Sequence, residues 1–151
     1  MNYWDSSALV TLFVEQSQSE KYLKKIKQDA EVLTAWHAVP ECVSAFCRLQ
    51  RENFITEAQL NTLIRHLEEA AENWYIITPG KRLEKLTLRS LRVHPLRAMD
   101  AIHLAAACLA RNEESPAMGF FTEDARLRTA ASKEGFEMGV AGAVHGPDRS
   151  P

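Results

Sequence analysis

Four acidic side chains stand at points of the chain where a metal-dependent nuclease would need them. Asp5 ends a short apolar run, and Glu41, Asp100 and Asp124 lie near the starts of helical patterns. In a parallel α/β sheet the strand ends and the following helix starts meet at one edge, so we expect the four carboxylates to share a pocket. Crowded carboxylates repel one another unless a divalent cation lies between them. Oxygen ligands alone suit Mg²⁺ or Mn²⁺, and such an ion can promote phosphodiester hydrolysis.

Each acid also has a simpler explanation when it is taken alone. Asp5 before Ser6 and Ser7 reads as an ordinary helix entry, and Asp100 and Asp124 could complement helix dipoles. Only the combination of the four residues favours a metal site.

Short β-prone runs alternate with amphipathic helical patterns along the chain. Strands are predicted at 1–4, 32–34, 74–77, 118–121 and 136–138, and helices from Ser6 onward and over 17–29, 39–49, 56–72, 81–92, 98–110 and 123–133. Thr56 with Gln59 predicts a capping box, and Thr122 is the predicted cap of the last helix. This alternation is typical of a mostly parallel sheet covered by helices on both faces. We expect one three-layer α/β/α domain over residues 1–140 and a loose tail over 141–151.

Composition limits the class of protein. The 151 residues carry 18 basic and 20 acidic side chains, so the net charge of -2 gives no general attraction to nucleic acid. The three cysteines, Cys42, Cys47 and Cys108, are odd in number and lack zinc-ligand spacing, which fits a reduced compartment. No apolar run is long enough to cross a membrane. We expect a cytoplasmic protein with no membrane segment.

Four sequence blocks, taken in order, resemble a known family. They are YWDSSAL at 3–9, PECVSA at 40–45, RAMDAIHLAAA at 97–107 and FTEDARL at 121–127. Together they are similar to a PIN domain, and most similar to the VapC-type toxin ribonucleases of bacterial toxin–antitoxin pairs. The resemblance covers nearly everything but the tail.

The resemblance implies an endoribonuclease dependent on Mg²⁺ or Mn²⁺, in which the four acids are both catalytic and metal-binding. It implies supporting roles for the hydroxyls of Ser7 and Thr122. It further implies an RNA substrate, a cognate antitoxin, a homodimer, and contact with DNA only through the antitoxin. Glu123, next to Asp124, could share the role of the fourth acid. The RNA target and the choice between one and two metal ions stay open.

Basic residues gather on one face of the helix predicted at 81–92. They are Lys81, Lys85, Arg89 and Arg92. This face could be an ordinary solvated surface or a stripe that follows RNA phosphates.

The histidines are weaker candidates than the acids. His103 lies one turn beyond Asp100 but is expected to pack rather than bind metal, and the other four histidines show no mutual ligand spacing. Two rival functions stay open. One is a degenerate PIN domain that binds RNA or a protein without cutting. The other is a HAD-type phosphatase, which would need an aspartate where this chain has Ser7.

Overall fold

A computed structural model describes residues 1–111 and 118–139. The predicted tail at 141–151 and the last residue of the predicted domain, 140, lie outside the described residues, so the domain boundary stays a prediction. Among the described helices, none is long and apolar enough to cross a membrane.

The centre of the molecule is a five-stranded sheet in which every neighbouring pair of strands is parallel. The strands are β1 (Asn2–Trp4), β2 (Val32–Ala35), β3 (Tyr75–Ile77), β4 (Gly119–Phe121) and β5 (Glu137–Met138). Their order is β3-β2-β1-β4-β5, with Tyr3 of β1 aligned with Leu33 on one side and Phe120 on the other. Each predicted strand is present to within one or two residues. The first strand of the chain is therefore the central one, and Asp5 follows it directly.

Seven helices accompany the sheet within the described part of the chain. They are α1 (Ser6–Val10), α2 (Ser19–Gln28), α3 (Ala38–Arg51), α4 (Glu57–Ala71), α5 (Lys81–Val93), α6 (Ala98–Ala110) and α7 (Ala125–Lys133). The predicted capping box of Thr56 and Gln59 is confirmed. The prediction that Thr122 caps the last helix is wrong. Asp124 occupies that position, because its carboxylate accepts the backbone N–H of Leu127.

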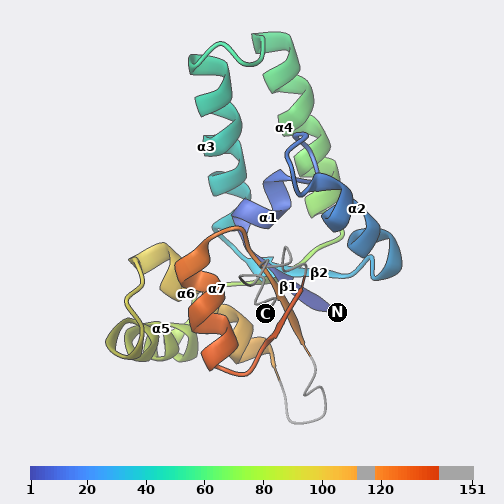
Figure 1. The fold of residues 1–151 in the computed structure, drawn as a ribbon. Coiled ribbons are helices and arrows are strands. Elements are labelled where there is room, and N and C mark those ends of the chain that lie inside the picture. Colours follow the sequence, from blue (N-terminus) through green and yellow to red (C-terminus); the bar gives the residue numbers. More distant parts are fainter. Residues whose placement is uncertain (112–117, 140–151) are drawn as a thin grey trace, which may run out of the picture.

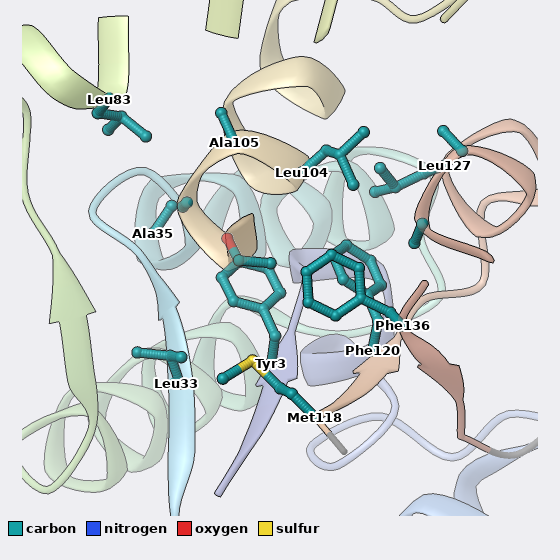
Figure 2. Packing of buried hydrophobic residues seen from close by; sticks show 14 residues of the cluster. Tyr3, Leu33, Ala35, Leu83, Leu104, Ala105, Met118, Phe120, Leu127 and Phe136 are labelled. Atoms are coloured by element: carbon teal, nitrogen blue, oxygen red, sulfur yellow. The ribbon is translucent and has the colours of Figure 1, made fainter. Parts of the chain in front are cut away.

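Two hydrophobic cores lie on opposite faces of the sheet, as expected from the alternation of side chains along a strand. Tyr3 packs with Phe120, Leu104 and Leu127 under α6 and α7, and Figure 2 shows these side chains converging on the sheet. The next residue, Trp4, packs on the other face with the residues of α1 to α4. Figure 1 shows the two sets of helices on either side of the strands. The predicted three-layer α/β/α architecture is therefore confirmed.

The layers differ in how closely their helices approach the sheet. Helix α6 buries Ala101, Ala105, Ala106 and Ala107, and these small side chains let its backbone lie close to β2. On the other side, α3 and α4 form a long hairpin that projects beyond the rest of the molecule (Figure 1). The hairpin turns near Asn53, whose φ of 61° lies in the left-handed region that asparagine tolerates.

Candidate active site

Asp5 is the most buried of the four predicted acids, with 3% of its surface exposed. It caps α1, and its Oδ1 accepts hydrogen bonds from the Ala8 backbone N–H at 3.1 Å and from Ser7 Oγ at 2.7 Å. Its Oδ2 accepts a hydrogen bond from Thr122 Oγ1 at 2.9 Å. Burial raises the pKa of Asp5, although nearby His103 and these hydrogen bonds offset part of the effect.

The hydroxyls of Ser7 and Thr122 connect Asp5 to the segment that carries Asp124. Ser7 Oγ accepts the backbone N–H of Glu123 at 2.8 Å, and Thr122 Oγ1 accepts the backbone N–H of Asp124 at 3.0 Å. Each hydroxyl therefore donates to Asp5 and accepts from the β4–α7 loop. Segments more than a hundred residues apart in the sequence are fixed side by side in this way.

The other three acids line one cleft of about 580 Å³. Glu41 lies in the first turn of α3, Asp100 in the first turn of α6, and Asp124 at the start of α7. Burial raises the pKa of Asp100, and the negative charges of Asp124 and Glu41 raise it further. The electrostatic effect shows that the three carboxylates act on one another across the cleft. Asp5 is not among the lining residues.

The four carboxylates are nevertheless not drawn together as ligands of a single ion would be. Among the described residues, one group of three or more side chains brings its potential ligand atoms within 4.8 Å of one another, and that group is His37, Glu41 and His103.

Two histidines flank Glu41. His103 Nε2 lies 2.8 Å from Glu41 Oε2, and its Nδ1 lies 2.8 Å from the hydroxyl of Tyr3. His37 Nε2 is 3.8 Å from the same Glu41 oxygen, and the two imidazole rings are 4.3 Å apart between centroids. Burial raises the pKa of Glu41, but the hydrogen bond and charge of His103 outweigh it, so this pKa lies below its usual value. Burial and the charge of His103 lower the pKa of His37 to about 4.

The prediction for the histidines is therefore only partly right. His103 is buried, as expected of a packing residue, but it also bonds an acid of the site. His37 was overlooked, although it precedes Glu41 by one helical turn, which is a spacing that places two side chains on one face. The contact between His103 and Glu41 has no such local signal in the sequence, because His103 lies on α6 and Glu41 on α3.

The neighbours of the acids include residues that the sequence argument did not single out. Arg97 and Arg126 line the cleft, each within three residues of a predicted acid. Glu123, in contrast, accepts a hydrogen bond from the hydroxyl of Tyr22 and lies 3.7 Å from Arg128. Its carboxylate is therefore engaged on α2 and α7 and is not among the residues that line the cleft.

The four basic side chains of the predicted stripe lie on α5 and are exposed. Two of them are paired, because Lys81 Nζ lies 3.0 Å from Glu84 and Arg89 Nη1 lies 2.9 Å from Glu134. Lys85 and Arg92 make no ion pair with any described residue. None of the four lines the acidic cleft.

Comparisons with known proteins identify the fold. No family model and no curated protein matches the sequence. Solved structures do match. A toxin–antitoxin complex from Klebsiella pneumoniae has a TM-score of 0.66 at 14% identity and covers 93% of this chain and 98% of its own. FitAcB from Neisseria gonorrhoeae has a TM-score of 0.66 at 15% identity, covering 87% and 94%. VapC20 from Mycobacterium tuberculosis, a sarcin-ricin loop cleaving toxin, has a TM-score of 0.58 at 14% identity, covering 86% and 95%.

Identities this low establish the fold alone. At that level the predicted resemblance to VapC-type PIN domains is confirmed, because the matches cover nearly the whole of each chain.

The raised pKa of Asp100 predicts how metal-free stability depends on pH. The ionised carboxylate is less favourable in the folded chain than in the unfolded one, so its cost is absent below the usual value of 3.8 and complete above the folded pKa. We expect Asp100→Asn to raise the thermal midpoint in EDTA at pH 7. The gain should shrink and disappear as the solution is acidified, when Asp100 becomes neutral.

The matched control is Glu15→Gln, which removes an exposed carboxylate from a loop and makes no ion pair with a described residue. Calorimetry of the three proteins from pH 3 to pH 7 checks the prediction. A destabilised Asp100→Asn protein at pH 7, or a difference that does not vary with pH, would contradict it.

Proposed function

We propose that this protein is a divalent-metal-dependent endoribonuclease and the toxin of a toxin–antitoxin pair. The observation that carries the proposal is the meeting of Glu41, Asp100 and Asp124 in one cleft. These residues come from three different helices, each of which starts at the carboxyl edge of the parallel sheet, where ligands of such folds bind. The likeness in fold to toxin structures supports the same reading.

The donor set fits Mg²⁺ or Mn²⁺. The three carboxylates that line the cleft would hold the ion, and all of their ligand atoms are the oxygens that hard cations prefer. When bound, such an ion supplies Lewis-acid activation of a phosphoryl oxygen and a water of lowered pKa. The raised pKa of Asp100 agrees with a place for positive charge in the cleft.

Asp5 has a different part in this proposal from the other three acids. Its oxygens accept hydrogen bonds from Ser7 and Thr122, and it is buried, so it fixes the loop that carries Asp124. This arrangement supports the roles that the resemblance implies for the two hydroxyls.

Arg97 and Arg126 address the difficulty that an acidic cleft repels RNA. Both line the cleft beside the carboxylates, and a guanidinium group can donate two parallel hydrogen bonds to a phosphate. They provide the local attraction for a polyanion that the net charge of -2 does not.

Removing one acid of the cleft should abolish RNA cleavage. We expect Asp124→Asn to lower the cleavage rate in Mg²⁺ or Mn²⁺ by at least about 100-fold, because even residues that only support a metal ligand are worth 10 to 100-fold. The matched control is Glu123→Gln, which changes the adjacent carboxylate, engaged with Tyr22 and Arg128, and should keep activity close to that of the parent.

Cleavage of a panel of structured and single-stranded RNAs, with and without EDTA, is the measurement. Equal activity of the Asp124→Asn protein and the parent would reject the cleft as the active site. If the parent binds RNA but cuts none of it with either metal, the protein is a binding module and not a nuclease.

We further infer that the cognate antitoxin inhibits by placing a basic side chain among the acids. An arginine can pair bidentately with carboxylates and would relieve the same repulsion that a metal ion relieves. Metal and antitoxin should then compete, so inhibition at a fixed antitoxin concentration should weaken as Mg²⁺ or Mn²⁺ is raised. A titration of cleavage against metal concentration tests this competition. Inhibition that does not respond to metal would place the antitoxin elsewhere.

The basic stripe on α5 supports a narrower role in RNA binding than the sequence predicts. Of the four stripe residues, only Lys85 and Arg92 make no ion pair with a described residue, so we expect them to contribute more than Arg89, which pairs with Glu134. Replacing both with alanine should weaken binding to unrelated RNAs and reduce the slope of log K against log salt by about one for each phosphate that is no longer neutralised. Arg89→Ala should change the slope less. An unchanged slope in the double variant would make the stripe an ordinary solvated surface.

The predicted homodimer and cytoplasmic location stay predictions, as does contact with DNA only through an antitoxin. The homodimer and the DNA contact rest on the sequence resemblance, whereas the location rests on the cysteine pattern and on the lack of a membrane-length apolar run.

A further inference from the structure

The geometry around Glu41 points to a second metal site, and we propose that His37, Glu41 and His103 bind a divalent transition-metal ion of the zinc class. The site differs in chemistry from the all-oxygen cleft, and the proposal does not depend on nuclease activity. One potential ligand atom from each of the three side chains lies within 4.8 Å of the other two.

His37 provides the strongest evidence for a ligand. The side chain is 1% exposed, and one ring nitrogen faces the backbone of Met99, but neither ring nitrogen makes a well-aligned hydrogen bond within the described part of the chain. A buried polar group without a partner is costly, so such a group in a native fold needs an explanation. Its Nε2 faces Glu41 Oε2 at 3.8 Å, too far for a hydrogen bond. A metal ion between these two atoms would satisfy both.

His103 is already held in the orientation that a metal ligand requires. Its Nε2 faces Glu41, and its Nδ1 lies 2.8 Å from the buried hydroxyl of Tyr3. Metal-binding histidines nearly always use the second ring nitrogen to donate to a fixed partner, which sets the tautomer and the angle of the ring. The Tyr3 hydroxyl can accept as well as donate. His103 can therefore donate from Nδ1 and present the lone pair of Nε2 to an ion.

The spacing of the three side chains suits bonds to zinc. Zn–N and Zn–O bonds of about 2.0 to 2.2 Å in a tetrahedron separate neighbouring ligand atoms by about 3.3 Å. The Glu41 oxygen lies 2.8 Å from His103 and 3.8 Å from His37, which are distances on either side of this value. Modest rotations of the two rings would equalise them.

The choice of ligands selects the class of metal. Imidazole nitrogens suit zinc and its neighbours in the first transition row better than they suit Mg²⁺, which prefers oxygen. Neutral imidazole is the form that binds. With two histidines and one glutamate, the ion keeps a fourth position for water. That position can face the cleft, because Glu41 lines it and is 27% exposed.

Glu41 belongs both to this site and to the acidic cleft. An ion held by the two histidines would therefore draw on a carboxylate that the proposed Mg²⁺ site also uses. Occupation of the two sites is coupled through this one residue.

Cobalt binding to the full chain tests the proposal. Co²⁺ replaces zinc and gives visible absorption that reports its ligand geometry, so we expect a tetrahedral spectrum that stoichiometric Zn²⁺ removes and excess Mg²⁺ does not. His37→Gln should weaken Co²⁺ and Zn²⁺ binding by at least about 10-fold, the lower bound for loss of a supporting residue. His66→Gln, which changes an exposed histidine on α4, should leave binding unchanged.

Asp124→Asn distinguishes this site from the acidic cleft. It should keep the cobalt spectrum, because Asp124 is not one of the three ligands. Loss of the spectrum in Asp124→Asn, or its full retention in His37→Gln, would overturn the proposal. If His37→Gln does not fold, imidazole ¹⁵N resonances of the parent protein decide the question. Zn²⁺ should shift those of His37 and His103 but not that of His66, and unshifted His37 and His103 resonances would reject the site.

Discussion

The hydrogen bonds of the buried Asp5 carboxylate hold together the edge of the sheet where the four acids lie. An ionised carboxylate away from water is costly unless it is hydrogen-bonded, and Asp5 meets this requirement with donors from both ends of the described chain. Ser7 and Ala8 come from the first helical turn, whereas Thr122 lies 117 residues beyond Asp5. The bonds can form only if β1 and β4 are neighbours in the sheet, as they are. Satisfying this one group thus ties the order of the strands to the geometry of the cleft.

Charge crowding follows from the same topology. Parallel strands bring their carboxyl ends to one edge of the sheet. Helices α3 and α7 follow β2 and β4 there, and α6, which leads into β4, starts at the same edge, so Glu41, Asp124 and Asp100 meet in one cleft. The consequences differ from acid to acid. Burial and its acidic neighbours raise the pKa of Asp100, whereas the pKa of Glu41 is lowered by the hydrogen bond to His103 and by the nearby charge of that ring. The cleft therefore holds one carboxylate whose pKa is raised and one whose pKa is lowered.

The histidine pair gives this edge a second chemical character. The acids line an open cleft, while His37 and His103 lie behind Glu41 and are buried. The Glu41 carboxylate thus borders both the acidic cleft and the pair of histidines. Glu41 would belong to both proposed sites. A metal ion bound by the two histidines would therefore change the availability of the Glu41 carboxylate to a Mg²⁺ or Mn²⁺ ion in the cleft.

The sequence by itself determined the architecture and identified the three acids that line the cleft. Alternating short strands and amphipathic helices required a parallel sheet with helices on both faces, and four acids at strand ends or helix starts had to reach one edge of it. Local signals of this kind are readable because periodicity and capping depend on near neighbours, as the capping box at Thr56 illustrates.

Only the tertiary structure decided which side chains meet across elements. It separated buried Asp5 from the three acids that line the cleft, turned Glu123 toward Tyr22, and paired Arg89 with Glu134. It also brought His103 from α6 to Glu41 on α3. These contacts join residues that are tens to a hundred positions apart, and no local pattern encodes them. They depend on the strand order and on how closely α6 packs on the sheet, and both are properties of the whole fold.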